Sequence, residues 1–143
     1  MRYFFSLLAL TLASFASAEQ MIDTGEYIVH YSALSTENVP APVASAYGIT
    51  RSKNQGMVNI TVLRKTEDGV NEHVEAKVAA AARNLSGQRR TIDFELVTEQ
   101  DANYYIGTFR VANEEHLTFT VEVVLPGEAD PLEFTFSQKF YTD

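Results

Sequence analysis

Hydrophobic and polar residues alternate along most of the chain after residue 25, with the two-residue period of a β-strand. Tyr27, Val29 and Tyr31 show this alternation near the start. Adjacent strand residues point to opposite faces, so each segment has one apolar face to bury. The segments that follow this pattern are predicted to be strands, about seven in all: residues 25–34, 57–63, 73–82, 90–98, 104–111, 117–125 and 132–141.

One of these segments, residues 73–82, fits two structures. Val74, Ala76 and Val78 alternate with other residues as in a strand, but residues 79–82 are four alanines, which have the highest intrinsic helix propensity. We favour a strand, because both neighbouring segments are strands and pairing in a sheet overrides propensity.

Turn signals separate the segments and set the fold class. Pro42 can open a short helix over residues 42–47 that Gly48 ends, and Asp68-Gly69 supplies the positive φ of a tight turn. Seven short strands with alternating faces cannot bury those faces in one open sheet. The sequence therefore predicts an all-β, immunoglobulin-like antiparallel β-sandwich with one short helix, without the disulfide or buried tryptophan of antibody domains.

The first eighteen residues have the three parts of a secretory signal peptide. Arg2 gives a basic start, residues 3–15 are mainly apolar, and Ala16-Ser17-Ala18 is a small-residue cleavage site. We expect cleavage after Ala18, which leaves residues 19–143 as a single domain. An uncleaved membrane anchor is the alternative, but the apolar stretch is shorter than the roughly 20 residues of a spanning helix.

Composition narrows the compartment and the partners. The chain has no cysteine, which excludes a lipid-modified cysteine and disulfides, so we expect a periplasmic protein that is free of the membrane. Its formal net charge is −8 at pH 7, and loss of Arg2 with the signal makes it more negative. This charge argues against nucleic acid and anionic lipid as partners and weakly favours a cationic one.

Candidates for catalysis and metal binding are weak. His30, His73 and His116 lie far apart without a metal-binding spacing, and we interpret them as polar-face or loop histidines. Ser52 and Ser86 lie in predicted turns, where serine hydroxyls usually bond the nearby backbone. We predict no catalytic residue, metal site or cofactor, and therefore no enzyme.

The first candidate binding surface is the loop at residues 51–56. Arg51 and Lys53 place two cations beside Asn54 in an otherwise acidic chain, with Tyr47 close in sequence. Such a loop could receive an anionic or peptide ligand, although cations in loops are commonly only solvated.

The second candidate surface is the strand that contains Tyr104, Tyr105 and Arg110. An aromatic and a cation on the outer side of a strand can form a recognition face. Adjacent strand residues point to opposite sides, so we expect one of the two tyrosines to belong to the core.

Several short stretches resemble a known family of small exported proteins of gammaproteobacteria. They are Tyr47-Gly48-Ile49, Arg51-Ser52-Lys53-Asn54, Asn84-Leu85 with Gly87-Gln88, Tyr104-Tyr105-Ile106-Gly107 with Phe109, Asn113-Glu114-Glu115, and Gln138-Lys139-Phe140-Tyr141. The mature chain resembles, from end to end, the family catalogued as domain of unknown function 4426. The resemblance implies a periplasmic β-sandwich and supplies no activity, cofactor or catalytic residue.

Our leading hypothesis is a non-enzymatic module that binds another protein through an exposed strand edge or the loops at one end of the sandwich. An inhibitor or immunity-type protein is one version of it. The alternative is a small-ligand or metal carrier, which a pocket around Arg51, Lys53 and a tyrosine, or two facing histidines, would support. An enzyme would need a perturbed carboxylate or histidine beside a cleft.

Overall fold

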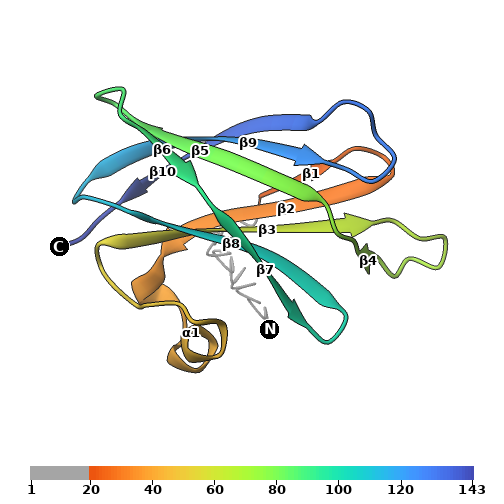
Figure 1. Ribbon diagram of the computed structural model, residues 1–143, viewed down its shortest axis with the longest axis horizontal. Coiled ribbons are helices and arrows are strands. Elements are labelled where there is room, and N and C mark those ends of the chain that lie inside the picture. The colour runs from red at the N-terminus through yellow and green to blue at the C-terminus, as the bar shows by residue number, and fades with distance from the viewer. Residues whose placement is uncertain (1–19) are drawn as a thin grey trace, which may run out of the picture.

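The computed structural model describes residues 20–143, and the predicted signal peptide with its cleavage site at Ala18 lies outside them. This part of the chain forms ten strands, a 3₁₀ turn and one α-helix (Figure 1). The elements are β1 (Gln20–Asp23), β2 (Tyr27–Ser35), η1 (Thr36–Asn38), α1 (Ala41–Tyr47), β3 (Gln55–Arg64), β4 (Glu72–His73), β5 (Lys77–Asn84), β6 (Arg89–Ile92), β7 (Phe94–Glu99), β8 (Ala102–Arg110), β9 (Glu115–Val124) and β10 (Leu132–Phe140).

The strands form two antiparallel sheets that pack face to face. Sheet A has the order β1-β2-β3-β8-β7, with β4 also paired to β3, and sheet B has the order β10-β9-β5-β6. The path β2-β3-β8-β7 is the ABED sheet of an immunoglobulin constant-type domain, and β10-β9-β5 is its GFC sheet. The predicted immunoglobulin-like sandwich is therefore confirmed, with β1 and β6 added at sheet edges.

The inner faces of both sheets make one apolar core. Leu117, Phe119 and Ile60 are fully buried, and the ring of Phe119 stacks on Phe136 with centroids 4.8 Å apart. The hydroxyl of Tyr105 lies at the edge of this core. Removing such side chains from water is the main source of the fold's stability.

The prediction of a single strand over residues 90–98 is wrong, because the structure has two strands there, β6 and β7. This is one reason why the sequence predicts fewer strands than the structure contains. The chain leaves sheet B after Ile92, passes Asp93, and joins sheet A as β7 from Phe94. Alternation continues through this crossing because Ile92 and Phe94 both contribute to the same core. The crossing chain lies so close to β8 that a Cβ on Gly107 would be 2.3 Å from Ile92 Cγ2.

Residues 73–82 form strands and not a helix, as favoured from the sequence. The segment is divided: β4 ends at His73, and β5 begins at Lys77. In between, the amide of Ala76 donates to the Tyr105 hydroxyl at 2.8 Å. Together with β1, this division explains the remaining difference between seven predicted strands and ten observed ones.

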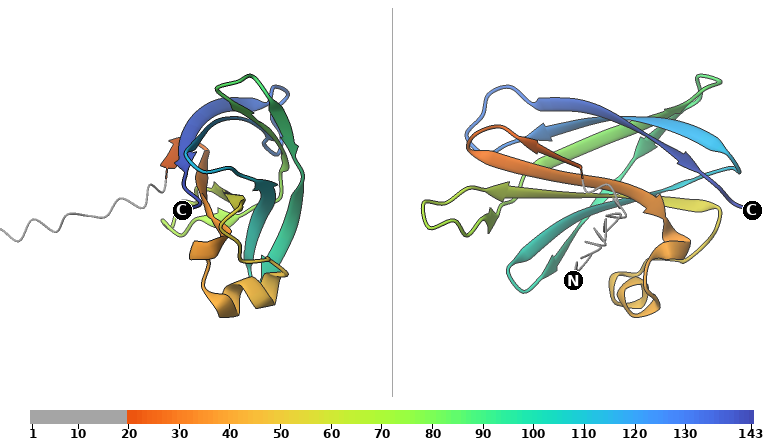
Figure 2. Two further views of the ribbon diagram at one scale, coloured as in Figure 1. Left: turned by 90° about the vertical axis from the view of Figure 1, so that its left-hand side faces the viewer. Right: turned by 180° about the vertical axis from the view of Figure 1, so that it is seen from behind.

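The short helix lies where the sequence predicts it. Gly48 ends α1 in the left-handed conformation with φ of 68°, and its amide donates to the Ala44 carbonyl. The helix covers part of the outer face of sheet A, where Val39, Ala44 and Met57 form a second, small apolar cluster. Figure 2 shows α1 on the side of sheet A away from sheet B. Within residues 20–143, no helix is long and apolar enough to cross a membrane.

Candidate functional site

A pocket lies between α1 and the outer face of sheet A. It has a volume of about 250 Å³, and we call it the helix pocket. Its walls are mainly apolar and include two tyrosines, one from the helix and one from β8. The lining residues are Val39, Val43, Tyr47, Ile49, Met57, Asn59, Tyr104 and Ile106.

One polar atom in the helix pocket has no partner. Asn59 lies on the outer face of β3, because its neighbours Val58 and Ile60 point into the core. Its Oδ1 atom is buried and accepts no hydrogen bond from any described residue. Buried acceptors without partners are uncommon, since each costs about 1–3 kcal/mol. Asn59 therefore places an unpartnered, buried acceptor beside the apolar wall of the pocket.

A second hollow of about 370 Å³ continues from the helix pocket towards the edge strand β7, and we call it the acidic groove. The two share Tyr47, Ile49 and Ile106. Asp93 and Glu95 contribute carboxylates to the groove, and none of its lining residues is a cation. The other lining residues are Gly48, Thr50, Gln55, Thr91, Val97 and Thr108.

Tyr47 stands between the two hollows and is tied to β7. Its hydroxyl donates a hydrogen bond to the Glu99 carboxylate at the end of β7. This bond, followed by desolvation, raises the pKa of Tyr47. The contact links the end of α1 to the β7–β8 hairpin and holds the Tyr47 ring where it lines both hollows.

The structure separates the predicted tyrosines as strand geometry requires. Tyr105 is buried in the core, whereas Tyr104 lies on the outer face and lines the helix pocket. The sequence-predicted candidates Tyr47 and Tyr104 thus meet in one pocket. Arg110 is exposed, lies opposite Gln55 on β3, and does not line the pocket or the groove.

The cationic loop at residues 51–54 contributes little to this site. Arg51 donates from Nη2 to the Glu37 carbonyl at 3.0 Å, which holds the loop against η1. Asn54 accepts from the Val111 amide through its carbonyl at 2.9 Å, and the side chain of Lys53 is exposed. Neither cation lines the helix pocket or the acidic groove.

The three histidines lie on two different faces. His30 and His73 are on the outer face of sheet A but on opposite sides of β3, and His116 is on the outer face of sheet B. His73 Nδ1 accepts the Asn103 amide at 3.2 Å, so its neutral form carries the proton on Nε2. Among residues 20–143, no three His, Cys, Asp or Glu residues gather as metal ligands.

The two serines considered as nucleophiles lie in turns. Ser52 Oγ accepts the Asn54 amide at 3.1 Å, which is the local backbone bond expected from the sequence. The amide of Ser86 donates to the side chain of Asn84 at 3.1 Å. These contacts serve the turns.

Comparison with known proteins assigns the family. The model of the family described as "Domain of unknown function (DUF4426)" matches residues 21–143. The chain belongs to the DUF4426 family. The resemblance found from the sequence motifs is thereby confirmed. No protein of curated function matches the chain significantly.

A solved structure of a DUF4426 family protein from Pseudomonas aeruginosa PAO1 is similar to this DUF4426 chain throughout. The two are 33% identical, with a TM-score of 0.73 over 87% of this chain and 96% of that one. Two members of the family therefore share the same β-sandwich fold.

More distant solved structures share the fold. FetP of uropathogenic Escherichia coli strain F11, expressed recombinantly in the periplasm of E. coli, is 12% identical, with a TM-score of 0.58 over 85% of this chain and 93% of that one. A copper-bound variant of FetP is 13% identical, with a TM-score of 0.58 over 86% and 95%. At these identities the likeness concerns the fold alone.

Sequence reasoning missed most of this DUF4426 site. The missed pocket residues lie on the outer side of their strands: Met57, Asn59 and Ile106. The missed groove carboxylates, Asp93 and Glu95, lie where the chain crosses into β7. A signal was present, because Met57 and Ile106 are apolar residues at outward positions. Apolar residues on an outer face indicate that another element covers it.

Proposed function

We propose that this protein is a non-enzymatic binding module of the bacterial periplasm that recognises an extended, basic segment of a partner protein. The observation that carries the proposal is the acidic groove, which has no cation among its lining residues and opens into an apolar pocket beside an edge strand.

The edge strand supplies main-chain recognition. β7 ends the order of sheet A, and no described strand pairs with its outer side. Such an edge presents unpaired amide and carbonyl groups, so an extended peptide can add to it as a further strand. Main-chain bonds of this kind give affinity without requiring a particular sequence.

The groove and the pocket supply specificity. Glu95 lies on the outer face of β7, opposite Ile106, and Asp93 lies at the start of the strand. Lysine or arginine side chains of a bound segment would face these carboxylates. An apolar side chain would enter the helix pocket past the residues that the two hollows share, Tyr47, Ile49 and Ile106. The pocket is too small for a large ligand but holds one side chain.

The test is selection of a displayed random peptide library on the exported protein. We expect the selected peptides to be rich in Lys and Arg alternating with apolar residues. Glu95→Lys reverses a charge in the groove, and Val43→Trp obstructs the helix pocket. Each variant should weaken peptide binding about tenfold. Glu128→Lys in the exposed β9–β10 loop is the matched control and should leave binding unchanged. Selection of acidic peptides, or equal weakening by all three variants, would overturn the proposal.

A metal carrier is the second candidate, because one observation favours it. Met21 on β1 lies directly opposite His30 on β2, and the buried His30 Nδ1 has no hydrogen-bond partner among the described residues. Thioether and imidazole are ligands of copper, and a FetP variant with the same fold is copper-bound. Elemental analysis of the purified protein distinguishes the two functions. Stoichiometric copper in the wild type and in His116→Ala, but not in His30→Ala, would favour the carrier over the binding module.

A further inference from the structure

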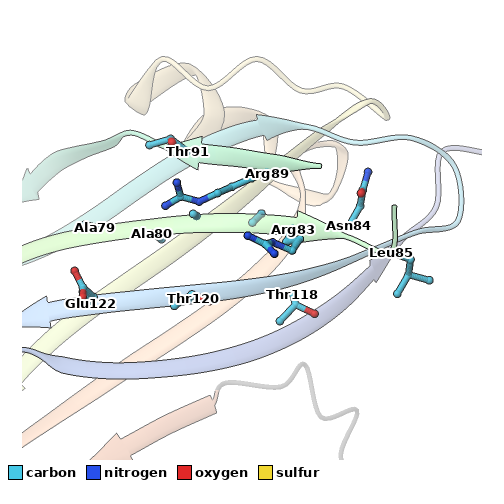
Figure 3. Close-up of a pocket in the computed structure, with 12 residues that line it drawn as sticks. Ala79, Ala80, Arg83, Asn84, Leu85, Arg89, Thr91, Thr118, Thr120 and Glu122 are labelled. Carbon is cyan, nitrogen blue, oxygen red and sulfur yellow. The ribbon is translucent and has the colours of Figure 1, made fainter. Parts of the chain in front are cut away.

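The outer face of sheet B carries a shallow trough of about 780 Å³ (Figure 3). Its floor is low because β5 presents only Ala79 and Ala81 at the centre of this face. Thr118 and Thr120 of β9 lie along one side and Thr91 of β6 along the other. Alanine and threonine leave room above a sheet that longer side chains would occupy.

Two arginines stand directly opposite each other at one end of this trough. Arg83 on β5 pairs in register with Arg89 on β6, and both side chains are exposed. Like charges at directly opposite positions of an antiparallel pair destabilise a sheet. Within residues 20–143, neither guanidinium forms a hydrogen bond or ion pair, so no described carboxylate offsets their repulsion.

This pair is unusual in a chain with 11 Lys and Arg against 19 Asp and Glu. On its other side, Arg83 faces Thr118 of β9 and not an acid. The acid of the trough, Glu122, lies opposite Ala79, four residues earlier on β5 and therefore about 13 Å along the strand. The trough thus has a cationic end and, well separated from it, a carboxylate.

We propose that this trough binds an extended acidic peptide segment, with a carboxylate held between the guanidinium groups of Arg83 and Arg89. Guanidinium groups donate to carboxylates in a fork geometry, and the attraction of an anion between the two to both cations would offset their mutual repulsion. Leu85, 85% exposed at the same end, offers an apolar contact to a neighbouring residue of the segment.

The dimensions favour a peptide over a single small anion. The lining runs along β5 from Ala79 to Asn84, about 17 Å in an extended strand, and continues to Leu85 in the next turn, whereas a lone oxyanion would fill only the arginine end. The site shares only Thr91 with the acidic groove, whose other lining residues do not contribute to the trough and whose carboxylates give it the opposite charge preference.

The experiment is a titration of the exported, isotope-labelled protein with a hexaglutamate peptide, followed by backbone amide NMR shifts. We expect saturable shifts confined to β5, β6 and the facing part of β9, weaker by at least tenfold in the double variant Arg83→Gln/Arg89→Gln. The double variant Arg51→Gln/Lys53→Gln removes two cations elsewhere and should bind as the wild type does. Inorganic phosphate is the second probe, and we expect it to bind at least tenfold more weakly than the peptide.

Three results would overturn the proposal. Equal loss of binding in both double variants would show unspecific charge attraction. Phosphate affinity equal to that of the peptide would show a simple oxyanion site. A lower urea midpoint for Arg83→Gln/Arg89→Gln would show that the arginines stabilise the fold, whereas relief of their repulsion predicts an equal or higher midpoint.

Discussion

The carboxylate of Glu115 allows a prediction whose size follows from the structure. Its side chain, 10% exposed at the start of β9, accepts from Arg90 Nη1 at 2.8 Å and Nη2 at 2.9 Å. It also accepts from Asn84 Nδ2 at 3.1 Å and from the Ala112 amide at 3.2 Å. One carboxylate therefore joins the β5–β6 hairpin to the turn before β9.

These bonds, first of all the one from Arg90, lower the pKa of Glu115 from 4.5 to about 2. Such a difference corresponds to at most about 3–4 kcal/mol of stability. Because Arg90 is 29% exposed, solvent screening reduces this to about 1–2 kcal/mol. A lowered pKa stabilises the folded state fully above pH 4.5, and the gain is lost as the pH falls towards 2.

The perturbation is Glu115→Gln, and the assay is urea unfolding at pH 7 and pH 3. We expect the variant to be about 1–2 kcal/mol less stable at pH 7. The difference should fall by about half at pH 3, because there the Glu115 carboxyl of the unfolded chain is already protonated. Glu114→Gln changes the exposed neighbour and should shift stability by less than about 0.5 kcal/mol. An equal difference at both pH values, or none at pH 7, would show that the ionised Glu115 carboxylate does not stabilise the fold.

Three further substitutions test the packing, each by urea unfolding. Gly107→Ala places a Cβ 2.3 Å from Ile92 and should destabilise by about 1–3 kcal/mol, because the crossing chain must move; a neutral effect would contradict the close approach. Tyr105→Phe removes the hydroxyl that accepts the Ala76 amide and should cost about 1–2 kcal/mol, whereas no loss would mean that water replaces it. Phe119→Ala should cost about 3–5 kcal/mol, and a loss below 2 kcal/mol would show that the core collapses around the gap.

The sequence predicts the fold class well because alternation reports which residues face a core. It does not report which sheet a strand joins. Ile92 and Phe94 keep the same period while the chain moves from sheet B to sheet A, so one strand is predicted where two exist. The four alanines of residues 79–82 were correctly predicted as a strand, since pairing with β6 and β9 outweighs their helix propensity.

The candidate site was predicted only in part. The sequence points to Tyr47 because it is close to the cationic loop, and to Tyr104 as one of two adjacent tyrosines on a strand with Arg110; the two line one pocket. Arg51 and Lys53 were selected for their charge, yet they lie outside it. The pocket depends on where α1 packs on sheet A, and the pairing of Arg83 with Arg89 depends on the register of β5 and β6. Both are long-range arrangements that a local pattern does not encode.

Site-specific photocrosslinking tests the proposed function most directly. A photoreactive benzoylphenylalanine at Val97 lies in the acidic groove, and the same residue at Glu128 lies in an exposed loop as a control. In cells that make the protein, we expect one discrete protein adduct from Val97, joined through a basic, extended segment, and none from Glu128. No adduct from Val97, or the same adduct from both positions, would show that the acidic groove does not bind a partner protein.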